Sequence, residues 1–76
     1  MTKSEAFRNL LQSDEFQAEI VAMRKELTDL IIHSDDDESS VREAAYVRIR
    51  TINELMARFE SIAKDDEIKE KAWKIL

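Results

Sequence analysis

The chain has 76 residues, and it contains no glycine, no proline and no cysteine. Because glycine and proline make most tight turns and end most helices, their absence predicts a nearly all-helical chain and excludes most loop-built active sites. The lack of cysteine excludes disulfides and, with a single histidine, argues against a structural zinc site, while a net charge of −5 disfavours binding to a nucleic-acid backbone.

The first predicted helix covers about residues 3–12. Thr2 and Glu5 have the spacing of a capping box, in which the two side chains satisfy free amides of the first turn. Phe7, Leu10 and Leu11 then follow on one face of this short helix. Phe7 is also a candidate interface residue, because aromatic side chains are frequent anchors between proteins.

The second predicted helix covers about residues 14–32. Ser13 precedes it as the expected N-cap, and Asp14 and Glu15 place negative charge where the helix dipole favours it. Its apolar residues recur at alternating intervals of four and three, which is the spacing of a heptad seam. This seam consists of Phe16, Ile20, Met23, Leu27 and Leu30.

The segment between the two long helices is acidic, with Asp35 to Glu38 following the single histidine, His33. An EF-hand loop that began at Asp35 would need Gly at its sixth position and Glu at its twelfth, but Ser40 and Tyr46 stand there. Two interpretations stay open: a solvated turn whose charges cap the next helix, or a weak site for a divalent cation. We assign no metal ligand and no cofactor to the chain.

The third predicted helix covers about residues 41–64 and begins at a second capping box, formed by Ser40 and Glu43. Tyr46, near its start, is a further candidate interface residue. Its apolar stripe repeats the spacing of four and three found in the second helix. The core residues of this stripe are Ala45, Ile49, Ile52, Met56 and Phe59.

A last short helix is predicted at about residues 66–76, because Asp65 and Asp66 interrupt the apolar spacing. Trp73 lies off the apolar face of this helix and close to Ile75 and Leu76. Such a group of large apolar side chains is costly to leave in water, and Trp is among the commonest interface anchors. We therefore predict that Trp73, Ile75 and Leu76 belong to an interface.

Together these elements predict an all-α fold in one domain, residues 1–76: an antiparallel hairpin of two long helices flanked by short N- and C-terminal helices. Chains below roughly 70 to 80 residues seldom bury enough core to fold alone. We therefore expect a homo-oligomer in which the hairpins form a helix bundle. Residues 1–40 hold 4 basic and 10 acidic side chains and residues 41–76 hold 8 and 7, which favours pairing between the two halves.

Neither a membrane location nor catalysis finds support in the sequence. The longest apolar run, as in Ile20–Met23, is about four residues, so we expect no membrane span and a cytoplasmic protein. There is no second histidine, no cysteine and no glycine-framed nucleophile, so we assign no catalytic residue and expect no enzyme.

Direct nucleic-acid binding is not expected either. The long periodic stripe through the arginines of the third helix does not resemble a helix-turn-helix unit. We expect these arginines to pair with the acidic second helix or with a partner subunit, and Glu54 to pair with Arg58 along the helix. The arginines are Arg42, Arg48, Arg50 and Arg58.

Two functions of different classes fit these features. The first is an assembly protein that oligomerises through its apolar stripes. The second is a small acidic regulator or inhibitor that imitates a nucleic acid on a nucleic-acid-handling enzyme. A decoy needs evenly spaced acids at the density of phosphates, whereas acids in the second half of this chain are interleaved with Lys and Arg. The charge pattern therefore favours assembly.

The chain ends in Ile68-Lys-Glu-Lys-Ala-Trp-Lys-Ile-Leu76. In this ending, and in its lack of Gly, Pro and Cys, it resembles the small acidic helical proteins encoded by tailed bacteriophages. The resemblance implies a role in virion assembly or in host takeover, with a viral or host protein as partner, in the host cytoplasm or the virion. It carries over no catalytic residue.

Overall fold

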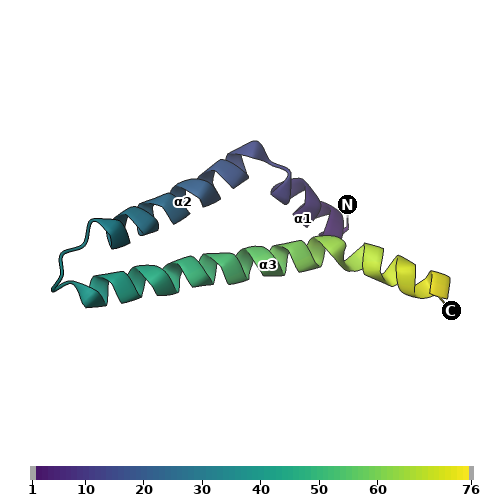
Figure 1. Ribbon diagram of the computed structural model, residues 1–76. Coiled ribbons are helices and arrows are strands. Elements are labelled where there is room, and N and C mark those ends of the chain that lie inside the picture. Colours follow the sequence, from purple (N-terminus) through teal and green to yellow (C-terminus); the bar gives the residue numbers. More distant parts are fainter. Residues whose placement is uncertain (1, 76) are drawn as a thin grey trace.

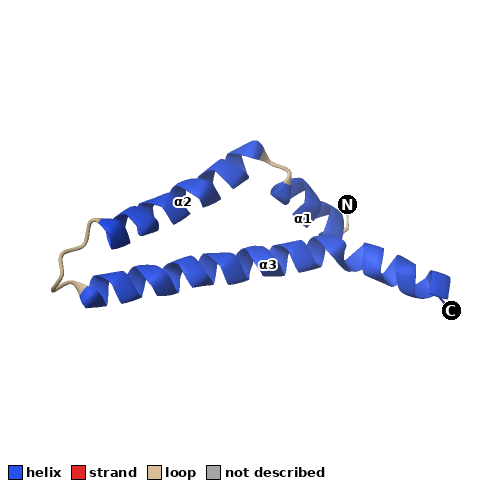
Figure 2. Cartoon of the chain, viewed as in Figure 1, coloured by secondary structure: helices blue, strands red, loops and turns tan. Residues whose placement is uncertain are grey.

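The computed structural model of the protein describes the backbone of residues 2–75 and the side chains of residues 2–65. Its helices are α1 (Lys3–Leu11), α2 (Asp14–Ile32) and α3 (Ser39–Ile75), and residues 2–75 contain no strand. Figure 2 shows that only two short connections lie between them. The predicted all-helical class is therefore confirmed.

Thr2 and Ser13 cap the first two helices, as the sequence predicts. The amide of Glu5 donates to Thr2 Oγ1 over 3.1 Å, and the amide of Phe16 donates to Ser13 Oγ over 3.3 Å. Gln17 links the two helices, because its Nε2 donates over 2.9 Å to the carbonyl of Leu11, the last residue of α1. These bonds satisfy groups that helix ends leave unpaired.

The start of α3 differs from the prediction. The helix begins at Ser39, so Ser40 lies inside its first turn and is not the N-cap. Glu38 takes the position before the helix, and its carbonyl accepts hydrogen bonds from the amides of Val41 and Arg42 over 3.1 and 3.3 Å. The acidic turn thus places its last carboxylate at the N-terminus of α3, where the helix dipole favours negative charge.

The end of α3 also differs, because the helix continues without interruption to Ile75. The predicted break at Asp65 and Asp66, and with it a separate C-terminal helix, is wrong for the backbone. Aspartate costs well under 1 kcal/mol in a helix interior, compared with roughly 3 kcal/mol for proline. Elongation adds a hydrogen bond for each residue without a new nucleation cost, so two aspartates do not end a long helix.

Both shorter helices pack against α3. In Figure 1, a loop joins α2 to α3 at one end of the molecule, and α1 returns to α3 towards the other. Arg8 holds this return, because its Nη1 donates to the carbonyl of Ala63 over 2.9 Å. Figure 1 also shows α3 changing direction close to α1. A side-chain donor that competes for a helical carbonyl is a known cause of such bends.

The core lies between α2 and α3. Ile20, Ile52 and Met56 form its centre and are 7%, 8% and 6% exposed. The ring of Phe59 on α3 lies 5.1 Å from that of Phe7 on α1 and 6.3 Å from that of Phe16 on α2, centroid to centroid. Phe59 therefore joins all three helices. The half-buried residues packed on this centre are Leu11, Phe16, Leu27 and Phe59.

The molecule is a thin layer. Its extents are 58 × 27 × 14 Å, so the molecule is about four times as long as it is thick. The radius of gyration is 17.3 Å, whereas a compact chain of this length would have about 11 Å. The accessible surface of 6172 Å² likewise exceeds the roughly 4,800 Å² of a compact monomer of this mass.

Candidate interaction surface

Large apolar side chains are exposed along α2 and α3. The exposed fraction rises from 44% for Met23 to 66% for Ile32. Isolated exposed aliphatics are ordinary on protein surfaces, but these all belong to the two helices that carry the predicted seams. The others in the described part of the chain are Val21, Leu30, Tyr46, Val47 and Leu55.

A groove of about 380 Å³ lies between α2 and α3 on one side of the layer. Met23 and Leu27 contribute from α2, and the buried Ile52 contributes from α3. Glu26 stands at the α2 wall and Arg48 at the α3 wall, and both side chains are exposed. The groove is therefore an apolar trough with an acid on one wall and a base on the other.

The apolar surface continues past both ends of this groove. Leu30 follows Met23 by seven residues, and Leu55 follows Arg48 by seven, which is about two helical turns and the same helix face. They are 46% and 49% exposed. We call this surface the groove face and define it by Met23, Glu26, Leu30, Arg48 and Leu55.

Val21 lies elsewhere on α2. At about 100° per residue, Val21 is roughly 160° round the helix from Met23, so it does not belong to the groove face. Ile32 follows Val21 by eleven residues, about three turns, and shares its face. Among the described residues, the groove face combines exposed apolar residues of both helices with a groove between them.

The predicted core seam divides into buried and exposed members. Ile20, Ala45, Ile52 and Met56 are buried. Phe16, Leu27, Ile49 and Phe59 are half-buried. Met23 and Leu30 are 44% and 46% exposed, so their predicted burial is wrong for the single chain. The reason is geometric. Apolar residues spaced alternately four and three apart form a stripe that is wider than the contact between two helices, so residues on one side of the stripe stay exposed.

Two buried residues escaped the predicted core, Ser4 and Ala63, each 5% exposed. Both lie on the helices that Arg8 joins, and small side chains allow two helices to approach closely. Ala63 continues the four-three spacing beyond Phe59, and this regularity was the signal for it. Ser4 offered no apolar signal, because a buried hydroxyl looks like a surface residue in a sequence pattern.

The predicted interface residues have different surroundings. Tyr46 is 58% exposed and remains available to a partner. Phe7 is half-buried with its ring against Phe59, so it packs at least partly within the chain, and its interface position stays a prediction. Trp73 and Ile75 belong to the last turns of α3, but their side chains lie outside the described residues, as Leu76 does entirely.

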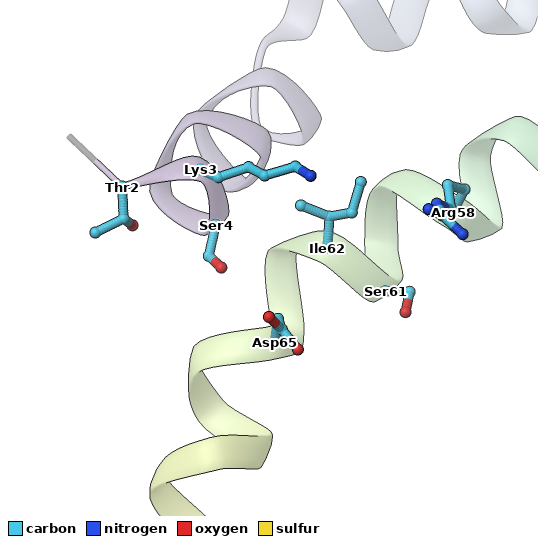
Figure 3. Close-up of a pocket in the computed structure, with 7 residues that line it drawn as sticks. All are labelled: Thr2, Lys3, Ser4, Arg58, Ser61, Ile62 and Asp65. Carbon is cyan, nitrogen blue, oxygen red and sulfur yellow. The ribbon is translucent and has the colours of Figure 1, made fainter.

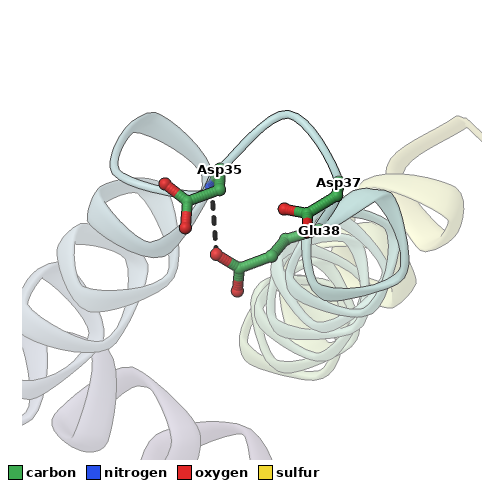
Figure 4. Close-up of side chains that lie close together, drawn as sticks. All are labelled: Asp35, Asp37 and Glu38. Carbon is green, nitrogen blue, oxygen red and sulfur yellow. Dashed lines mark hydrogen bonds between the residues drawn. The ribbon is translucent and has the colours of Figure 1, made fainter.

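The acidic turn is an ordered structure. Asp35, Asp37 and Glu38 bring carboxylate oxygens within 4.8 Å of one another (Figure 4). Glu38 Oε1 accepts a hydrogen bond from the amide of Asp35 over 3.0 Å. His33 ends α2 beside them and is exposed. The turn therefore already uses one carboxylate to close itself, which agrees with the interpretation of a solvated, helix-capping connection.

Arg42 holds this turn from α3. Its Nη1 donates to Ser34 Oγ over 3.0 Å and to the carbonyl of Asp35 over 2.6 Å, and its Nη2 donates to the carbonyl of Asp36 over 3.4 Å. A planar guanidinium presents its donors in a rigid fork that reaches separated oxygens, whereas the three donors of a lysine radiate from a single nitrogen. Arg42 thus has a structural role, and it is not free for a nucleic-acid phosphate.

We expect Arg42→Ala to lower the free energy of unfolding by about 1–2 kcal/mol, because bonds from a charged donor to the turn are lost. Urea denaturation followed by circular dichroism measures this change. Arg42→Lys is the control, since it keeps the charge but loses the fork, and we expect it to recover less than half of the loss. Equal stability of all three proteins would show that the turn does not depend on the guanidinium.

The predicted ion pair between Glu54 and Arg58 is wrong. Glu54 forms its ion pair with Arg50, at 3.9 Å, and not with Arg58. Arg58 instead lines a hollow of about 420 Å³ where α1 meets α3. Figure 3 shows this hollow, in which Arg58 and Asp65 of α3 lie opposite the first residues of α1. Its lining is mainly polar, so it differs from the apolar groove between α2 and α3.

Comparison of the chain with models of protein families, with curated proteins and with solved structures finds no match. Within the part of the chain that the structure describes, no helix has both the length and the apolar character needed to cross a lipid bilayer. The groove face and the thin shape of the molecule are therefore the features that bear on its function.

Proposed function

We propose that this protein is a non-enzymatic assembly protein in which α2 and α3 form an antiparallel hairpin that self-associates into a helix bundle. The observation that carries the proposal is the single-layer shape, 14 Å thick. Stable domains enclose a core between at least two layers of secondary structure, because each helix must cover its apolar stripe. A second layer would supply this cover.

The surface area supports the same conclusion. The chain exposes roughly 1,400 Å² more than a compact monomer of equal mass. Only five apolar residues of the described part are buried, and two of them are alanines, Ala45 and Ala63. Such a small core contributes little against the conformational entropy of ordering a chain of this length. Disulfides cannot add stability, because the chain has no cysteine. Association is therefore the remaining source of stability, since it buries further apolar surface.

On the resemblance to tailed-phage proteins, the assembly would belong to a virion or to an infected cell. The competing proposal is a monomeric acidic regulator of a nucleic-acid-handling enzyme, for which the turn of Asp35, Asp37 and Glu38 would be the most concentrated negative charge in the described residues. Its acids would have to face a basic surface freely. Arg42 binds backbone carbonyls of this turn and leaves the carboxylates of Asp35 and Asp37 exposed, so the preference for assembly comes from the shape and the small core of the molecule.

Thermal unfolding at a series of protein concentrations tests the proposal. When association stabilises the folded state, the melting temperature rises with concentration by mass action. We therefore expect the melting temperature to rise by a few degrees for each tenfold increase in concentration. A melting temperature that is the same over a hundredfold range would indicate a monomer and favour the regulator.

A further inference from the structure

The groove between α2 and α3 carries one opposite charge on each wall. The side chains of Glu26 and Arg48 are exposed, and neither side chain makes a hydrogen bond or ion pair with another described residue. The ion pairs of the described chain lie elsewhere and within single helices, between Lys25 and Asp29 and between Arg50 and Glu54. Both groove charges are therefore available to a partner that lies over the groove.

A second copy of the chain can cover this face in two symmetric ways. If a two-fold axis lies across the helices, α2 covers the partner's α2, and Glu26 approaches Glu26 of the partner subunit. If the axis runs along the helices, α2 covers the partner's α3 at the same height. Each Glu26 then approaches the partner's Arg48, and the contact occurs twice because a two-fold interface is self-complementary.

Charge complementarity distinguishes the two arrangements. Like charges placed together oppose the first, and two opposite-charge pairs favour the second. Both arrangements make every neighbouring pair of helices antiparallel, as in an up-down four-helix bundle, so the charges alone distinguish them. Resting on the assembly function proposed above, we propose that a second copy occupies the groove, with α2 of each chain lying on α3 of the other.

The available area suits this occupant. A stable interface buries roughly 800 Å² on each partner, and the whole chain exposes roughly 1,400 Å² beyond a compact monomer. In the dimer, Met23 lies over the partner's groove, and Leu30 and Leu55 extend the apolar contact on either side. Glu26 and Arg48 stand at the rim, where charge pairs fix the register more than they add affinity.

Charge exchange between the two positions tests this register. Glu26→Arg and Arg48→Glu each replace two attractive contacts by two repulsive ones, so each is expected to raise the dimer dissociation constant by about tenfold or more. An equimolar mixture of these two variants should dimerise again, because one chain is positive at both positions and the other is negative at both. A chain that carries both substitutions has the two charges exchanged, so it keeps two attractive contacts and should dimerise like the natural sequence.

Native mass by light scattering is the measurement, and circular dichroism monitors helicity in every sample. Glu43→Arg is the matched control, since it makes the same charge change at an exposed position of α3 outside the groove face, and it should leave the dimer intact. If the natural chain dimerises and the mixture of variants does not recover dimers, the register is wrong while the assembly function stands. A natural chain that is monomeric throughout would overturn both.

Discussion

Ile52→Asp should abolish the cooperative fold. Ile52 is 8% exposed in the centre of the core and also forms part of the groove. A carboxylate buried there without a partner costs several kcal/mol. A chain of this length has only about 4–11 kcal/mol of stability in total. We therefore expect the variant to lose most of its helicity and its native mass, as measured by circular dichroism and light scattering.

Asn53→Asp is the matched control, because it adds the same charge at the next residue, which is exposed. We expect this control to change the free energy of unfolding by less than about 0.5 kcal/mol. If Ile52→Asp kept both the helicity and the native mass of the natural chain, the core described between α2 and α3 would be wrong.

Phe59→Ala should give the second largest effect. The ring of Phe59 contacts both Phe7 and Phe16, so its removal loosens α1 and α2 from α3 together. Truncating a buried Phe costs about 3–5 kcal/mol, and because Phe59 is half-buried we expect about 3 kcal/mol. Urea denaturation measures the loss, and amide exchange should become faster in α1 than in the middle of α3.

Val47→Ala provides the comparison, since Val47 is 58% exposed and its truncation should cost less than about 0.5 kcal/mol. An equal small loss for both variants would mean that the three rings do not hold the helices together. A loss at Phe59 without faster exchange in α1 would place the contribution of Phe59 in the contact with α2 alone.

The sequence predicts the helices well where local signals decide them. α2 begins and ends at the residues predicted from its N-cap and seam, Asp14 and Ile32. The caps at Thr2 and Ser13 form as expected, because a hydroxyl three residues before a free amide is a purely local arrangement. The heptad spacing likewise identifies Ile20, Ile52 and Met56 as buried, since these residues lie in the middle of the apolar stripes.

Features that depend on tertiary contacts could not be predicted in this way. The spacing does not show which flank of a wide stripe faces a neighbour, so Met23 and Leu30 were expected to be buried and are exposed. The bond from the Asp35 amide to Glu38 Oε1 belongs to a turn that Arg42 also binds from the next helix, and neither contact has a signal in the sequence. The partial burial of Phe7 depends on Phe59, more than fifty residues away in the sequence.

The groove face also could not be found from spacing alone. Glu26 and Arg48 are unremarkable surface charges in the sequence, and they gain significance because the fold places them on opposite walls of one apolar groove. Their juxtaposition depends on how α2 and α3 align along each other. This alignment follows from the length of the acidic turn and the way Arg42 holds it.

The native mass of the purified chain tests the central claim most directly. It should be measured by light scattering after size exclusion across a dilution series. We expect a species of at least twice the chain mass of 8.9 kDa, which dissociates only on dilution and loses helicity as it does so. A well-folded particle of 8.9 kDa at every concentration would contradict the account, because the single layer would then be stable without a partner.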